Sequence, residues 1–276
     1  MATAALCFAI TFVLIRVLSD SLHTFQIVLF RAIIAIVLLL PWLLRVGPKA
    51  LATTKWGLYG MRALVAYVAM VCWFYALGRM VLADASALQF TMPLWAVILA
   101  VLFLGERAGV SRWVATLVGF AGALVIIRPG MIETNLAAIA ALVSAALYSG
   151  GNIFIKALSR TEDSTAIAFL GFVYSLPLAV PLAVYFWQPT SWSDVPVIIA
   201  FGLATVGAQV SLARAMSLAD ASLLGPVDYL RLPVVAAFGF VFFDETPDLW
   251  TGAGAVIIVA STWYLTASEA RRSRSR

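Results

Sequence analysis

The five letters LADAS occur twice in the chain, at 82–86 and again at 218–222. The residues that follow share an order of features. "LADASALQFTMPLWAVILAVLFLGE" runs from 82 through Pro93 to Glu106, and "LADASLLGPVDYLRLPVVAAFGFVFFDE" runs from 218 through Pro233 to Glu245. A gap of three residues brings the two glutamates into alignment. A matched order of features over such a length indicates an internal repeat.

The composition identifies an integral membrane protein. Hydrophobic residues make up 63% of the 276 residues and charged residues 11%, against roughly 25% charged in an ordinary soluble domain. A soluble fold cannot bury that much apolar surface. The net charge of +5 does not indicate nucleic-acid binding, since the only basic run is the tail "RRSRSR". Such a tail is typical of a cytoplasmic anchor beside a membrane helix.

The sequence predicts no metal, disulfide or cofactor site. Cys7 and Cys72 both lie inside apolar stretches, where we expect them to be small buried side chains. His23 is the only histidine, which excludes a cluster of histidine ligands. The first residues, "MATAALCFAITFVLIRVL", lack a basic leading region, and we interpret them as a retained first span and not as a signal peptide.

Ten apolar runs are long enough to cross a bilayer, which requires about 20 residues each. We expect an all-α polytopic protein whose spans are 2–19, 24–44, 57–79, 84–105, 110–128, 135–158, 164–187, 195–217, 221–243 and 248–267. Asp84 and Asp220 lie at the two tightest connections, where each carboxylate is expected to cap the following helix.

The distribution of basic residues predicts that both termini are cytoplasmic. Twelve Lys and Arg residues fall in loops assigned to the inside: Arg45, Lys49, Lys55, Arg107, Arg112, Lys156, Arg160, Arg214, Arg271, Arg272, Arg274 and Arg276. Only Arg79 and Arg128 fall outside. Residues 1–130 then hold five spans and residues 131–267 another five, followed by the basic tail 268–276. Because five is odd, the second half enters the membrane inverted, an architecture frequent among secondary transporters.

The chain resembles the EamA-type, ten-helix members of the drug/metabolite transporter superfamily. The matching residues are "FR" (30–31), "ADASAL" with Pro93 and "LGE" (104–106), "GFAGALVIIRPG" (119–130), and in the second half "ADASLL", Pro226, Pro233 and "FDE" (243–245). The resemblance implies two inverted repeats around a central cavity in a bacterial inner membrane. It also implies transport of a small organic metabolite. Export of amino acids or related compounds is the leading interpretation, and uptake of a vitamin, nucleoside or methyl donor is the alternative.

The sharpest candidates for substrate contact are Asp228 and Arg231, three residues apart in the ninth span and so on one helical face. Charges in hydrocarbon are costly, so the two side chains either neutralise each other or open to bind a zwitterionic substrate. Asp228 could also titrate during proton coupling, and the energy source, proton exchange or the solute gradient itself, stays open. Pro226 and Pro233 flank the pair, and with Pro93 they are expected to bend their helices.

Further candidates form polar or aromatic stripes on spans that the resemblance places at the cavity. Tyr148 and Asn152 lie in the sixth span with Ser144, Gln209 lies in the eighth with Thr205, Gln89 and Trp95 lie in the fourth, and Trp73 lies in the third. Such stripes also form when helices pack by hydrogen bonds, so both interpretations stay open. Arg31 is interpreted mainly as a structural contact between helices, and Arg16 and Arg62 as side chains that reach the membrane surface.

Two other classes of protein, membrane-embedded enzymes and channels, fit the sequence less well. A membrane-embedded enzyme would need a motif such as G-x-S-x-G, H-E-x-x-H or a Walker loop, and the sequence contains none of them. A channel would be expected to carry a selectivity-filter signature in place of inverted repeats. The expected partners are therefore a small-molecule substrate, the lipid bilayer and, if transport is proton-coupled, protons.

Overall fold

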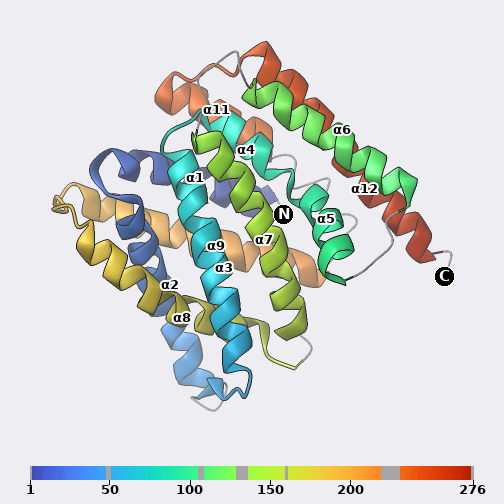
Figure 1. Ribbon diagram of the computed structural model, residues 1–276. Helices are drawn as coiled ribbons and strands as arrows, with labels where there is room; N and C mark the ends of the chain where they lie inside the picture. The colour runs from blue at the N-terminus through green and yellow to red at the C-terminus, as the bar shows by residue number, and fades with distance from the viewer. Residues whose placement is uncertain are drawn as a thin grey trace.

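The computed structural model describes residues 2–47, 51–104, 109–128, 136–158, 161–218 and 231–274. These residues form a bundle of long helices joined by short turns (Figure 1), and no strand occurs in these ranges. The helices are α1 (Ala2–Ser21), α2 (Thr24–Val46), α3 (Trp56–Leu77), α4 (Leu82–Gln89), α5 (Met92–Leu104), α6 (Val110–Ile127), α7 (Leu136–Leu158), α8 (Ser164–Tyr185), α9 (Asp194–Leu218), α11 (Arg231–Phe243) and α12 (Leu249–Arg274).

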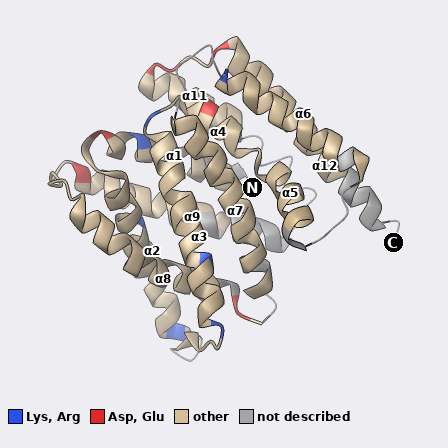
Figure 2. Cartoon of the chain, in the orientation of Figure 1, with Lys and Arg blue, Asp and Glu red and all other residues tan. Residues whose placement is uncertain are grey.

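Among the described residues, seven helical segments are long and apolar enough to cross a membrane, one of them being the α4–α5 segment Leu82–Leu102. Three shorter apolar segments are Trp113–Ile127, Asp194–Ala208 and Arg231–Phe243. Charged residues gather at the helix ends and in the connections (Figure 2), while side chains such as Leu44, Leu117 and Val256 are largely exposed. An apolar exterior with polar ends suits a lipid environment. The predicted all-α polytopic class is confirmed; the number ten stays a prediction, because residues 221–230 of the ninth span are not described.

The helices of the two halves of the chain pack against each other in matched pairs. α3 packs on α7, and the equivalent helices of the other half, α9 and α1, pack on each other. In the same way, the α2–α9 contact is equivalent to the α8–α3 contact. The α2–α8 and α6–α12 pairs each join helices that occupy equivalent places in the two halves. This arrangement is what two related halves would produce, and it supports the proposed division at residue 130.

The predicted fourth span, 84–105, is not one continuous helix. α4 ends at Gln89, Phe90 and Thr91 form a turn, and α5 begins at Met92. Pro93 has no N–H to donate to the carbonyl of Gln89, so the ladder is interrupted there. The Thr91 hydroxyl donates to the Leu88 carbonyl at 2.7 Å, and the backbone resumes as Leu94 N–H donates to the Thr91 carbonyl at 2.9 Å. Pro233 lies in the first turn of α11, and Pro226 lies outside the described residues.

The N-terminus of α4 corrects one sequence-based expectation. Val81 is the N-cap residue, and Asp84 does not cap the helix. The Leu82 N–H donates instead to Glu245 Oε2 at 2.9 Å, and Glu245 Oε1 lies 3.6 Å from the Arg16 guanidinium. Arg16 also donates to the Leu77 carbonyl, at the end of α3, at 3.2 Å. The Asp84 carboxylate accepts a hydrogen bond from Thr251 at 2.7 Å, which ties α4 to α12.

Candidate functional site

The first described residue of α11, Arg231, lies against aromatic rings from the first half of the chain. Its guanidinium carbon is 5.0 Å from the ring centre of Phe90, 5.3 Å from Phe8 and 5.7 Å from Phe12. A guanidinium within about 6 Å of a ring is attracted by the negative face of the π system. Three rings therefore stabilise one cation inside an apolar bundle.

Local structure explains how these rings meet. Phe8 and Phe12 are one turn apart on α1, with ring centres 6.5 Å apart. Phe90 lies in the turn between α4 and α5, and α1 packs directly on α11. The interruption of the fourth span therefore determines where one of the three rings lies. Broken helices at the centre of a bundle are a recurring feature of transporter binding sites.

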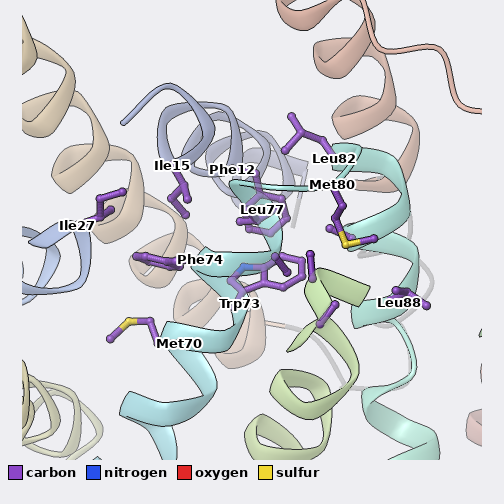
Figure 3. Packing of buried hydrophobic residues seen from close by; sticks show 14 of the residues in the cluster. Phe12, Ile15, Ile27, Met70, Trp73, Phe74, Leu77, Met80, Leu82 and Leu88 are labelled. Carbon is purple, nitrogen blue, oxygen red and sulfur yellow. The ribbon is translucent and has the colours of Figure 1, made fainter. Parts of the chain in front are cut away.

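The aromatic contacts around Arg231 continue from α1 to α3. Phe12 packs edge-on against Trp73 at 5.2 Å, with the two ring planes at 74°. Figure 3 shows Phe12, Trp73 and Met70 within one cluster of buried side chains, with Trp73 and Met70 both on α3. Residues three apart on a helix are neighbours on its surface. Trp73 and Met70 thus connect the surroundings of Arg231 to a second arginine.

That second arginine is Arg31 on α2. Its Nη1 donates to the sulfur of Met70, and its guanidinium carbon lies 5.3 Å from the ring centre of Phe172 on α8. It also interacts electrostatically with the Tyr148 hydroxyl on α7. Arg31 and Tyr148 are both partly buried. Side chains from α2, α3, α7 and α8 therefore meet around one cation.

The other predicted site residues are distributed as follows. Gln89 is buried and donates to the sulfur of Met92 at 3.5 Å, while its Oε1 has no hydrogen-bond partner among the described residues. Trp95 packs edge-on against Phe120 at 4.9 Å and is partly buried. Asn152, one turn beyond Tyr148, is exposed.

Two candidates cannot be located. Asp228 lies outside the described residues, and Gln209 lies in α9 with a side chain that is not described. The predicted Asp228–Arg231 pair therefore stays a prediction.

Several buried hydroxyls lie on the same helices as these candidates. Ser144 on α7 and Thr205 on α9 are 0% and 5% exposed, and neither hydroxyl oxygen has a hydrogen-bond partner within the described ranges. Tyr67 on α3 is buried in the same way. A buried polar atom without a partner is costly in hydrocarbon, so a polar group bound beside these hydroxyls would be stabilised.

The rings around Arg231 are not among the site residues that the sequence predicts, and from the sequence Arg31 is interpreted mainly as a structural contact. Phe8, Phe12 and Phe90 were indistinguishable from ordinary lipid-facing or core residues. The usable signal was Arg31 itself, a charge inside an otherwise apolar run. The Arg62 Nη1 donates to the Ile167 carbonyl at 3.0 Å, and Gly171 leaves room for its guanidinium, so Arg62 joins α3 to α8.

The predicted outer end of the bundle carries a polar network separate from the two arginines. Arg128 at the end of α6 forms an ion pair with Asp248, which also accepts hydrogen bonds from Thr251. The Thr251 backbone N–H, with Arg128 nearby, holds the pKa of the Asp248 carboxyl below its usual value. This network links α6 to α12.

A cavity of about 540 Å³ lies between α4, α11 and α12. Its lining is almost entirely apolar and includes Leu232, Pro233, Ala255, Val256 and Trp263. It carries no ionisable side chain among its described lining residues, so it does not contain the arginines. The described residues also contain no group of three or more His, Cys, Asp or Glu side chains that could hold a metal ion.

These features define a helical membrane protein with charged and aromatic side chains in its interior. The model of the EamA-like transporter family matches residues 1–128 and 135–267, and the chain belongs to this family. It is a multi-pass membrane transporter of the drug/metabolite transporter superfamily.

Three relatives show how the family's named substrates vary. The chain is 33% identical to a riboflavin transporter of Brucella anthropi over 90% of both chains. It is 28% identical to an S-adenosylmethionine uptake transporter of Rickettsia prowazekii, over 96% of this chain and 90% of the other. It is 30% identical to the pseudopaline exporter CntI of Pseudomonas aeruginosa, over 94% and 91%. A solved crystal structure shares the fold over 98% of both chains, with a TM-score of 0.63 and 18% identity.

Proposed function

We propose that the chain is a secondary transporter of a small aromatic metabolite, in the chemical range of vitamins and nucleoside-like compounds. The observation that carries the proposal is the placement of the Arg231 guanidinium at 5.0–5.7 Å from the rings of Phe8, Phe12 and Phe90. Arg231 belongs to the second half of the chain and the rings belong to the first. A solute bound among them would contact both halves, as alternating access requires.

Physical chemistry favours an aromatic ligand at this place. Ring faces and edges bind flat heteroaromatic groups through stacking and edge-on contacts of about 0.5–1.5 kcal/mol each. A guanidinium adds a planar donor that stacks on rings and forms hydrogen bonds with oxygen acceptors. Riboflavin and S-adenosylmethionine, named for two relatives, both contain fused heteroaromatic rings. These relatives favour the vitamin, nucleoside or methyl-donor alternative over amino acids.

Amino-acid export is the second candidate. One relative is named as an exporter, and an arginine beside aromatic rings would also accept the carboxylate of an aromatic amino acid. Flux measurements decide the direction of transport and whether it is coupled to protons. The proposed location is a bacterial inner membrane. Both termini are proposed to lie in the cytoplasm, because most Lys and Arg residues of the loops fall on the side of the termini.

The test is flux into proteoliposomes that contain the purified protein. Labelled riboflavin, S-adenosylmethionine and a mixture of amino acids are offered separately, with and without a pH gradient. We expect one solute to show saturable uptake and counterflow, and acceleration by a pH gradient would indicate proton coupling. Flux that never saturates for any solute would contradict a carrier.

Variants locate the site. Arg231→Gln removes a charged donor from the proposed site and is expected to lower kcat/KM about 10-fold or more, since a hydrogen bond to a charged group contributes about 1.5–3 kcal/mol. Asp228→Asn tests the predicted pair. Arg79→Gln is the matched control, because Arg79 also lies over a ring, Tyr75, at 4.1 Å but is exposed in a connection. Equal kcat/KM in intact protein and folded Arg231→Gln would contradict the proposed site.

A further inference from the structure

We infer that Arg31 binds an oxyanion, a carboxylate or phosphate group, of the transported solute, so that the substrate class is aromatic and anionic. The inference rests on the proposed function in one respect: it takes the bound ligand to be the solute that the protein transports. It concerns a second cation, which is linked to Arg231 through Phe12, Trp73 and Met70.

Arg31 lies deep in its helix. It is the eighth residue of α2, which places it about 10 Å along the helix axis at 1.5 Å per residue. The hydrocarbon layer is about 30 Å thick, so the guanidinium lies within it, where an arginine is unfavourable unless it faces water or a partner. Arg31 is partly buried as a whole residue, and its guanidinium packs against Met70 and Phe172.

The contacts of Arg31 do not neutralise its charge. Met70 offers a thioether and Phe172 a ring face. The Tyr148 phenol interacts with Arg31 only electrostatically. No carboxylate lies within ion-pair distance of Arg31 in the part of the chain that the structure describes. A guanidinium has five N–H donors, and a thioether is a weak acceptor for one of them. The donors that remain suit the two oxygens of one carboxylate or phosphate.

Other arginines in the spans and their ends have stronger acceptors. Arg16 has Glu245, Arg128 has Asp248, and Arg62 donates to the Ile167 carbonyl. These contacts fix one helix to another. Arg31 differs from them because its partners are soft or aromatic groups, which orient a guanidinium without competing strongly with an incoming anion.

Phe12, Trp73 and Met70 lie between the surroundings of the two arginines and indicate which chemical group of the solute bears the oxyanion. Phe12 contacts Arg231 and Trp73, and Trp73 is one turn from Met70, which contacts Arg31. A flat ring bound near Phe12 and Trp73 would direct a charged substituent toward Arg31 and Tyr148. The predicted substrate is therefore a ring system with an acidic side group, a class that differs from neutral riboflavin.

Binding to detergent-purified protein, measured by isothermal titration calorimetry, tests the inference without relying on flux. Two pairs of probes differ in charge and share a ring: indole-3-acetate with indole-3-acetamide, and riboflavin 5′-phosphate with riboflavin. We expect intact protein to bind the anionic member of a pair about 10-fold more tightly or better, as charge-assisted hydrogen bonds imply.

Substitutions assign that preference to Arg31. Arg31→Gln is expected to abolish it, and Arg31→Lys to retain part of it, because lysine keeps the charge and loses the planar fork. Arg45→Gln, at an exposed arginine in the last turn of the same helix, should leave it unchanged. If Arg31→Gln does not fold, Arg31→Lys and Tyr148→Phe carry the test through a reduced preference.

The outcomes separate this inference from the proposed function. An anion preference that is equal in intact protein and Arg31→Gln, or no preference in intact protein, would overturn the inference even if flux is observed. A preference lost in Arg31→Gln supports the oxyanion site, even if the proteoliposomes show no saturable flux and the proposed function fails.

Discussion

Single charged residues carry most of the functional information in this chain. Outside the basic tail, arginines within or beside apolar spans occur with three kinds of partner: a carboxylate for Arg16, a backbone carbonyl for Arg62 and aromatic rings for Arg31 and Arg231. The first two kinds join helices. The third kind places a cation against rings in the interior of the bundle, on α2 for Arg31 and on α11 for Arg231.

His23, between α1 and α2, gives a prediction at the same scale. Its Nδ1 accepts from the Phe25 N–H at 3.4 Å, and its ring stacks on Phe186 at 4.8 Å. Partial burial and the nearby Arg79 lower the pKa of His23 below its usual value of about 6.5. The unfolded chain then binds the proton more readily, so His23 supports folding above about pH 6.5 and opposes it as the pH falls below that value.

The measurement is the thermal unfolding midpoint of the detergent-purified protein between pH 5 and 8. We expect Tm to fall at acidic pH in intact protein. His23→Asn keeps an N-cap acceptor that does not titrate, so it should remove part of that fall. Superimposable pH profiles for the two proteins would exclude His23 as the group responsible.

At the scale of elements, two features position the site. One is the interruption between α4 and α5, which places Phe90 against Arg231. The other is the close approach of α6 and α12, which run side by side along one edge of the bundle (Figure 1). Small residues allow such an approach in membranes, where the packing of helix surfaces replaces the hydrophobic effect.

Glycine at 254 is required by this helix pair. A Cβ built on Gly254 would lie 2.6 Å from the Gly122 carbonyl oxygen, whereas a Cβ on Gly252 meets nothing within 4 Å. Gly254→Ala is therefore expected to lower the free energy of unfolding by about 1–3 kcal/mol through overpacking. Gly252→Ala, two residues away, should be neutral or stabilising by up to about 1 kcal/mol. Denaturant titration of both variants provides the comparison; equal stabilities would show that the helices separate without cost.

In the whole molecule, polar contacts between connections agree with the side of the membrane that the sequence predicts for each connection. Long-range polar contacts join connections that the sequence assigns to the same side: Ser21 with Asp194 and Arg128 with Asp248 at the predicted outside. At the predicted inside, Thr53 accompanies Glu162 and Lys55 accompanies Thr161. These contacts support the proposed order of crossings. They are independent of which side faces the cytoplasm.

Labelling of single cysteines tests that orientation. In a background of Cys7→Ala and Cys72→Ser, new cysteines are introduced as Ser193→Cys or Thr54→Cys, both at exposed positions in connections. A membrane-impermeant maleimide added to intact cells is expected to label position 193 and to spare position 54 until the cells are lysed. The reverse pattern would place the termini outside and invert the proposed topology.

The sequence by itself determined that this chain is a polytopic helical membrane protein with an internal repeat. Apolar runs and the location of basic residues are local properties, and a bilayer selects for them directly. The tertiary structure alone decided which groups meet. Arg16 and Glu245, Arg31 and Met70, and Arg231 and Phe90 are far apart in sequence and lie on different elements. Their contacts depend on how the helices pack and on where the fourth span breaks, which composition does not encode. An arginine in an apolar run is costly anywhere in the bilayer, and only packing determines whether a carboxylate, a carbonyl or an aromatic ring stabilises it.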